Sequence, residues 1–287
     1  MSASAIGTRP TPLRRRRTRA ALPVSVIVAG IVALFFVVAA VFPQALAPRS
    51  PLSIDLLNTL SGPSASHWLG TDDAGRDLYS RIVWGTRTSL LIGLGAMAVS
   101  LVIGIVLGFA SALAPNWIAQ PVNRFLEVLL AFPVLLLSLL FVALLGPSAP
   151  SLIIAVGIGS APGYARLIRA QALGVRESGY VEAARALGHT SRTIFAQHVF
   201  PNAFRPLVAL VALGIGQSVV WASGLSFLGL GVAPPSSEWG VLLNAGKSQI
   251  TTAWWLEVLP GVAIVLVALS FTQLGRYFQD RSEGITR

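Results

Sequence analysis

The chain has 287 residues, of which 54% are hydrophobic and only 11% are charged. Soluble domains carry about 25% charged residues, so this composition excludes an ordinary soluble domain and indicates a polytopic membrane protein. The chain has no cysteine, which excludes a disulfide scaffold, a thiolate zinc site and a cysteine nucleophile. Its net charge of +10 would suggest nucleic acid as the partner of a soluble protein. Here the arginines lie between apolar runs, so we interpret them as topology signals and expect no nucleic-acid partner.

The apolar runs predict an all-α fold with six transmembrane helices. Crossing a hydrocarbon layer of about 30 Å takes about 20 residues. The predicted spans lie at about residues 22–42, 88–112, 124–145, 151–170, 204–230 and 255–276. Pro133 and Pro162 lie inside the third and fourth spans, where we expect local kinks.

The basic residues predict that both termini lie in the cytoplasm. With the N-terminus inside, sixteen of the 21 Lys and Arg residues fall on the cytoplasmic side, which the positive-inside rule favours. The predicted organisation is a cytoplasmic basic tail (1–21), a first helix (22–42), an extracytoplasmic loop (43–86), a five-helix domain (87–276) with a cytoplasmic loop at about 171–203, and a cytoplasmic tail (277–287).

A polar motif precedes the second predicted span. It reads His67-Trp68-Leu69-Gly70-Thr71-Asp72-Asp73-Ala74-Gly75-Arg76-Asp77 and is followed by Ser80-Arg81. Its imidazole and carboxylates are ligand types that hold divalent metals, so one interpretation is a metal site made of His67, Asp72, Asp73 and Asp77. Arg76 and Arg81 are near enough in sequence to pair with the acids. We therefore favour a salt-bridged loop and expect no metal.

Two further patterns lie in the second and third spans. Small residues recur at four-residue intervals on the second span, which allows close helix packing, either within the chain or with a second subunit. They are Ala96, Ser100, Gly104, Gly108 and Ala112. Arg124 and Glu127 lie one turn apart at the start of the third span, which predicts an interfacial ion pair and argues against a buried proton relay.

Residues 180–202 form the only long polar segment in the second half of the chain. Glu182-Ala183-Ala184, then Gly188 and Pro201-Asn202, predict a short helix, a glycine turn and a second amphipathic turn that ends at the proline. A helix this short is marginal in water, so we expect it to rest on a partner surface.

The fifth span carries small and polar residues that either line a pathway or bond to neighbouring helices. They are Gly214, Gly216, Gln217, Ser218, Ser223, Gly224 and Ser226. No phosphate-binding loop is present, because Gly246-Lys247-Ser248 would need a leading glycine at position 241, which is Val241. No catalytic residue set is recognisable either, so we expect a protein without its own ATPase or catalytic site.

These motifs resemble those of ABC importer permeases of the peptide/nickel branch. In the cytoplasmic loop, Glu182, Ala183, Ala184, Gly188 and Pro201 match the family's coupling loop, whereas His198 stands where Ile is usual and Phe200 where Leu is usual. Before the second span, His67, Gly70, Thr71, Asp72, Gly75, Arg76 and Asp77 match the family signature, with Trp68 in place of the usual Pro. Residues 226–231 also match, whereas Leu274-Gly275-Arg276 departs from the usual Leu-Gly-Asp.

The resemblance implies the type I ABC importer transmembrane fold in a bacterial cytoplasmic membrane. It also implies a second homologous permease, two cytoplasmic ATPase subunits or a fused ATPase, and an extracytoplasmic substrate-binding protein. Glu182, Ala183, Ala184, Gly188, His198 and Pro201 would couple the chain to the ATPase, which binds the ATP, so no cofactor is expected in this chain. The implied cargo is small peptides, with nickel or metal chelates and haem as alternatives. A more distant alternative, an ion-coupled secondary transporter, predicts ionisable residues near the membrane centre, which the sequence does not offer.

Overall fold

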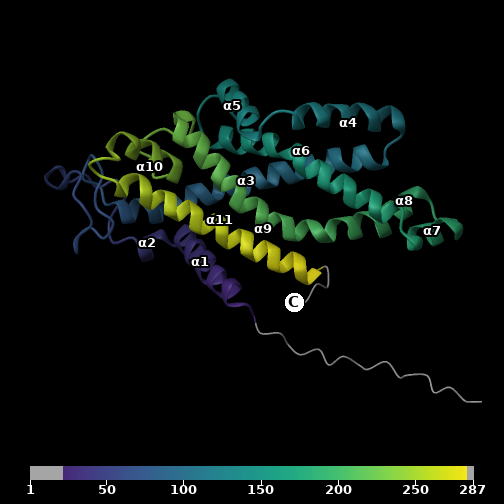
Figure 1. Cartoon of the computed structure of the whole chain (residues 1–287), viewed down its shortest axis with the longest axis horizontal. Coiled ribbons are helices and arrows are strands. Elements are labelled where there is room, and N and C mark those ends of the chain that lie inside the picture. The colour runs from purple at the N-terminus through teal and green to yellow at the C-terminus, as the bar shows by residue number, and fades with distance from the viewer. Residues whose placement is uncertain (1–21, 283–287) are drawn as a thin grey trace, which may run out of the picture.

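The computed structural model describes residues 22–282 as an elongated bundle of helices (Figure 1). Within these residues the only pairing of the strand type is an isolated bridge between Thr71 and Asp77. The predicted basic tail at 1–21 lies outside the described residues, as do the last five residues of the predicted tail at 277–287.

Five helices in the described part of the chain are long and apolar enough to cross a membrane. They are α1 (Val24–Val41), α3 (Leu78–Leu113), α6 (Ala149–Arg176), α9 (Phe200–Leu225, continued by a π-turn at Ser226–Leu230) and α11 (Trp255–Ser282). The shorter helices are α2 (Pro43–Leu46), α4 (Asn116–Leu130), α5 (Val134–Leu145), α7 (Gly179–Ala186), α8 (Ser191–Ile194) and α10 (Trp239–Gly246). Further single turns lie at Leu56–Asn58, Phe195–Val199 and Lys247–Gln249.

The third predicted span is not one helix. The sequence predicts a local kink within 124–145, but α4 and α5 meet at an angle of 95°, so the crossing count is six only if this bent pair counts as one span. Pro133 ends the helix because its ring disfavours helical geometry in the preceding residue and it lacks an N–H donor. Pro162, by contrast, lies buried inside the continuous helix α6.

The helices extend beyond the predicted spans. Helix α3 begins at Leu78, ten residues before the predicted start at 88, because the side chain of Asp77 caps it by accepting a hydrogen bond from the backbone N–H of Ser80. Charged residues such as Arg81 limit the stretch that lipid can cover, but they do not end a helix. The predicted loop at 43–86 therefore ends in helical structure.

The small-residue stripe of α3 packs within the chain, against α6. A Cβ atom on Gly104 would lie 2.8 Å from Cβ of Tyr164, and one on Gly108 would lie 2.8 Å from the carbonyl oxygen of Ala165. Ser100 donates a hydrogen bond of 2.8 Å to the carbonyl oxygen of Gly157. Close approach of the two backbones requires small side chains at these positions.

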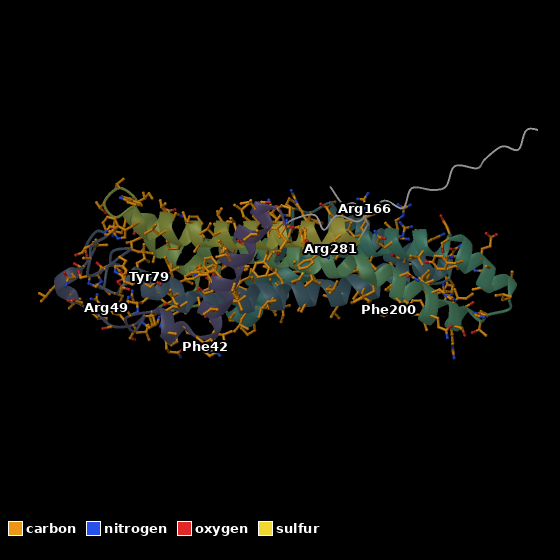
Figure 2. The ribbon with its side chains drawn as sticks, turned by 90° about the horizontal axis from the view of Figure 1, so that it is seen from below. Phe42, Arg49, Tyr79, Arg166, Phe200 and Arg281 are labelled. Carbon is orange, nitrogen blue, oxygen red and sulfur yellow. The ribbon has the colours of Figure 1, made fainter. Side chains whose placement is uncertain are left out.

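The molecule has two polar ends. Residues 43–77 and α10 lie at one end of the long axis, and α7 and α8 lie at the other (Figure 1). Side chains follow the same order along the axis: Arg49 and Tyr79 lie toward the first end, and Phe200 lies toward the second (Figure 2). Between them, the outward faces of α1 and α11 carry exposed apolar side chains such as Ile31, Leu34 and Val265, which suits contact with lipid.

Candidate functional site

The segment at 178–199, which we call the elbow, contains α7 and α8 and joins α6 to α9. Gly188 has a φ of +81° and ends α7 in a Schellman motif. The N–H of His189 donates to the carbonyl of Ala184 at 3.1 Å, and the N–H of Gly188 donates to that of Arg185 at 3.0 Å. The predicted glycine turn is therefore present, and its conformation is one that glycine adopts without strain.

The elbow rests on the bundle through one apolar face. Val181, Ala184, Ile194 and Val199 are buried in a cluster with residues of α3, α6 and α9, including Phe109. The ring of Phe109 lies 5.5 Å from that of Phe195 between centroids, in edge-to-face geometry. This packing explains how helices so short hold their shape.

Two arginines hold α6 against the end of α3 beside the elbow. Arg169 Nε donates to the carbonyl oxygen of Ser111 at 3.4 Å, and Arg176 Nη1 donates to that of Ala112 at 3.2 Å. The last carbonyls of a helix lack intrahelical partners and attract positive charge. From the sequence these arginines were interpreted only as topology signals. Their contacts depend on the packing of the end of α6 against the end of α3.

The motif residues of the elbow, and Pro201 just after it, differ in exposure. Glu182, Ala183, Gly188 and Pro201 are exposed, and His198 is half-buried. Ala184 is only 5% exposed and faces the chain's own core, so it belongs to the inner face of α7.

The expected stop at Pro201 is wrong. The chain runs from α8 through the π-turn into α9, where Pro201 lies in the first turn. The wider π-turn accommodates a residue without an N–H, and Asn202 Nδ2 donates to the carbonyl of His198 at 2.7 Å.

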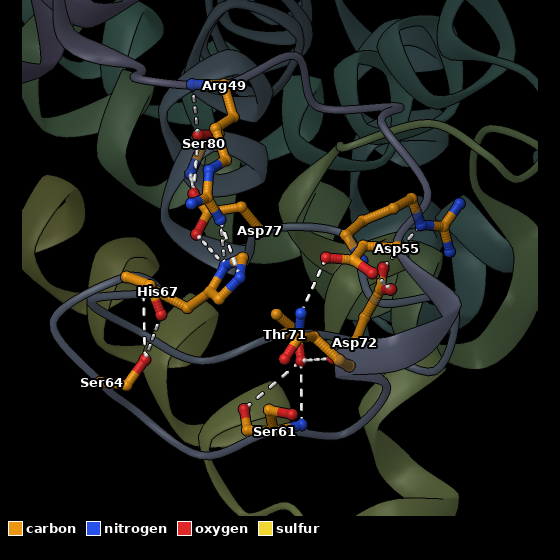
Figure 3. A network of polar contacts seen from close by, with 12 residues as sticks. Arg49, Asp55, Ser61, Ser64, His67, Thr71, Asp72, Asp77 and Ser80 are labelled. Atoms are coloured by element: carbon orange, nitrogen blue, oxygen red, sulfur yellow. Dashed lines mark hydrogen bonds and ion pairs between the residues drawn. The ribbon is translucent and has the colours of Figure 1, made fainter.

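At the opposite end, Asp72 organises a tight turn before α3 (Figure 3). Its Oδ1 accepts hydrogen bonds of 2.9 Å from the N–H groups of Ala74 and Arg76, and its Oδ2 pairs with Arg76 Nε at 2.7 Å and with Arg81 Nη1. Gly75 has a φ of +72° in this turn, and a Cβ there would lie 1.8 Å from the carbonyl oxygen of Asp55. The motif thus folds into a salt-bridged loop, as predicted.

His67 and Asp77 form the second half of this network. His67 Nδ1 lies 3.0 Å from Asp77 Oδ1, while Asp77 Oδ2 accepts from both the N–H and the hydroxyl of Ser80. Arg49 Nη1 lies 2.7 Å from both ring nitrogens of His67. The two side chains point toward each other in Figure 3. No group of three metal-ligating side chains occurs among residues 22–282. Pairing of the carboxylates with Arg76, Arg81 and His67 is the physical reason why the salt-bridged interpretation holds.

Arg81 joins this network to the loop before α10, and Glu238 ends that loop. Arg81 is 3% exposed, and its Nη2 donates to the carbonyl of Ser236 at 3.0 Å. Glu238 is 1% exposed and caps α10, accepting from the N–H groups of Gly240 at 2.9 Å and Val241 at 3.0 Å. Burial raises the pKa of the Glu238 carboxyl above its ordinary value. Glu238 was not among the predicted site residues, although an acid just before an apolar helical run is an N-cap signal.

Most of the small and polar residues of the fifth span pack against other helices. A Cβ on Gly214 would lie 2.1 Å from Met97 Sδ of α3, and one on Gly216 would lie 2.9 Å from the carbonyl of Ala268 of α11. Ser218, Ser223 and Ser226 are buried, whereas Gln217 is exposed. This arrangement favours the packing interpretation over a pathway lining.

Comparison with known proteins gives one family. Residues 100–284 match the family described as "Binding-protein-dependent transport system inner membrane component". The chain is 38% identical over 254 residues to the dipeptide transport system permease protein DppC of Alkalihalophilus pseudofirmus, covering 88% of this chain and 84% of the relative. It is 37% identical over 257 residues to the glutathione transport system permease protein GsiD of Pectobacterium atrosepticum, covering 88% and 85%.

Solved structures agree on the fold. A chain from an amino acid ABC transporter superposes with a TM-score of 0.57 at 17% identity, covering 70% of this chain and 94% of that one. A chain from the inward-facing MetNI methionine ABC transporter superposes with a TM-score of 0.55 at 20% identity, covering 72% and 97%. The chain therefore has the type I ABC importer transmembrane fold that its motifs predict.

Proposed function

Because the chain belongs to the family of binding-protein-dependent transport system inner membrane components, we propose that it imports small peptides and that a cytoplasmic ATPase moves it through the elbow. The chain is a multi-pass permease subunit of the cytoplasmic membrane. Relatives named for dipeptides and for glutathione, a tripeptide, support small peptides as the cargo. The family's description names a binding protein, which supports an extracytoplasmic partner that delivers the solute.

The outer face of the elbow supports the docking role. Tyr180 is 47% exposed and Leu187 is 78% exposed, in a segment that otherwise presents polar groups such as Glu182 and Arg185. Apolar anchors surrounded by a polar rim are typical of a surface that another protein covers. The inner face is packed against the bundle, so a force applied at the outer face reaches α6 and α9.

The connection of the elbow to α6 and α9 explains how the ATPase would drive transport. The elbow is continuous with α6 and α9, so closure of ATPase subunits would tilt these helices and open the pathway to alternate sides. We propose that a second homologous permease supplies the other half of the pathway, and that two ATPase subunits or a fused ATPase bind the ATP. In this arrangement the chain has no catalytic site of its own. The distribution of basic residues supports an elbow on the cytoplasmic side.

Substitution of Gly188 tests the elbow. Gly188→Ala forces a side chain into a left-handed conformation at a cost of about 1–2 kcal/mol, while its Cβ meets no neighbour within 4 Å. We expect peptide uptake and co-purification of the ATPase to fall together by about five- to thirtyfold, the population change that about 1–2 kcal/mol brings. Membrane insertion should be retained.

Gly174→Ala is the matched control, because Gly174 lies in α6 with open space around its Cβ position. Glu182→Ala is a second test, since this side chain is exposed and makes no ion pair in the described part of the chain. Normal ATPase binding and uptake in both Gly188→Ala and Glu182→Ala would contradict the docking role.

A further inference from the structure

Helix α4 has three distinct faces. Ala119 and Leu126 are buried against the bundle, and Trp117, Phe125 and Val128 form an exposed apolar face. At 3.6 residues per turn, the remaining face carries polar side chains. They are Gln120, Asn123, Arg124 and Glu127.

This polar face borders a hollow between α4 and α6. The hollow has a volume of about 600 Å³ and is lined by Gln120, Pro121, Asn123, Arg124 and Glu127 of α4 and by Arg169 of α6. Its size lies within the range of small-molecule sites, about 300–1,000 Å³. It is large enough to receive part of a small peptide.

The charges in the hollow favour an anionic group. Arg124 Nη1 lies 2.7 Å from Glu127 Oε2, so these two side chains neutralise each other. Arg169 donates through Nε to the carbonyl of Ser111, and within residues 22–282 no carboxylate pairs with it. Its two terminal nitrogens have no hydrogen-bond partner among these residues. A guanidinium edge of this kind matches the two oxygens of a carboxylate.

The position of the hollow points to water and not to lipid. Helix α4 lies alongside α6 in Figure 1, and together with α5 it is apolar enough to count as a span. Arg124 lies eight residues inside α4, about 12 Å from its start, and its side chain is 83% exposed. Ionised side chains are costly in lipid, so the exposed Arg124 and Glu127 suit contact with water or with another protein.

We propose that the hollow is a contact site for the carboxylate group of the solute in transit. Arg169 binds the carboxylate, and Arg124 joins it when the Arg124–Glu127 pair opens. Glu127 then faces a positive group such as the ammonium of the same solute. The site recognises features that all free peptides share, whatever their side chains. This proposal rests on the proposed import of peptides, and it names residues that contact them.

Thiol labelling of the complete importer in membranes tests the site, because the chain has no cysteine of its own. Asn123→Cys places a thiol in the hollow, and Phe125→Cys places one at the same depth on the apolar face. We expect Asn123→Cys to react about fivefold faster with a sulfonate-bearing thiol reagent than with a trimethylammonium-bearing one, as a nearby net positive charge predicts. Phe125→Cys should react with neither reagent.

Adding Arg169→Gln to Asn123→Cys should remove this charge preference. Adding Arg124→Gln and Glu127→Gln together should leave it, because these two side chains form a neutral pair and Arg169 remains. An unreactive Asn123→Cys would mean that lipid or the partner permease covers the hollow, and it would overturn the proposal. Equal rates with the two reagents, or a preference unchanged by Arg169→Gln, would also overturn it.

A second experiment, in which solutes are added during labelling, tests whether the hollow recognises a carboxylate. Dialanine should slow the labelling of Asn123→Cys, whereas dialanine amide should not. Protection by both compounds or by neither, in membranes that take up dialanine, excludes carboxylate recognition. The wild-type importer could take up no peptide and still show the charge preference and its loss in Arg169→Gln. That result would contradict the proposed peptide cargo and would support an anion-binding site in the hollow.

Discussion

The two polar ends of the molecule use their charged residues in opposite ways. At the end formed by residues 43–81 and the loop before α10, Asp72, Asp77 and Arg81 are at most 4% exposed, and each pairs with another protein group. At the elbow, Glu182, Arg185 and Arg192 are exposed. Both segments are polar motifs of similar length in an otherwise apolar chain, but only one of them is closed by its own contacts.

This difference separates a structural motif from the proposed docking motif. A buried polar group without a partner is costly, so the first end must satisfy its charges internally, and it fixes α3 against α10 in doing so. The elbow buries apolar side chains such as Val181 and Ile194 and leaves its charges outward. A surface left in this state can bind and release another protein without disturbing the fold.

The largest expected effect concerns the sides of the membrane on which the two ends lie. Ala65 and Ala186 are exposed alanines at opposite ends, so each can be replaced by cysteine as a matched pair. An impermeant thiol reagent should label Ala65→Cys in intact cells and Ala186→Cys only after permeabilisation of cells that lack the ATPase subunits. Labelling of Ala186→Cys in intact cells would reverse the proposed orientation.

Removal of one charge from the closed end should cost stability. Asp72→Asn leaves Arg81 buried without its carboxylate, and breaking a buried pair in this way costs about 3–5 kcal/mol. We expect a lower melting temperature of the purified protein in detergent. Asp73→Asn is the matched control: the Asp73 side chain is 69% exposed, and its loss should change stability by less than about 0.5 kcal/mol. Equal melting temperatures for the two variants would contradict the view of a closed end.

A smaller, pH-dependent effect is expected at Glu238. Burial raises its pKa in the folded protein, so its carboxyl binds a proton more readily there than in the unfolded chain, where the ordinary value is 4.5. The resulting stability is present below pH 4.5 and is lost as pH rises through the higher folded value. Glu238→Gln removes this dependence, so its melting temperature should improve relative to wild type as pH rises.

Glu177→Gln, at an exposed position at the end of α6, controls for the loss of one negative charge. If the difference in melting temperature between wild type and Glu238→Gln does not change with pH, the carboxyl of Glu238 does not titrate differently in the two states.

The sequence alone determined the features that depend on local chemistry. Long apolar runs must satisfy their backbone groups as helices in lipid, so the approximate places of five spans followed from composition, whereas the third predicted span is the bent pair α4 and α5. The left-handed turn at Gly188 and the pairing of Asp72 with Arg76 also depend on residues only a few positions apart. These features were therefore predictable without knowledge of any distant segment.

The tertiary structure alone decided which face of each element meets the rest of the chain. Pro133 breaks its helix while Pro162 does not, Ala184 turns inward while Ala183 stays exposed, and Arg169 reaches the end of α3 as well as the hollow. Each of these outcomes depends on contacts between segments far apart in sequence. A periodic pattern gives the faces of a helix, but only the packing of its neighbours determines which face is buried and which is left for a partner or a solute.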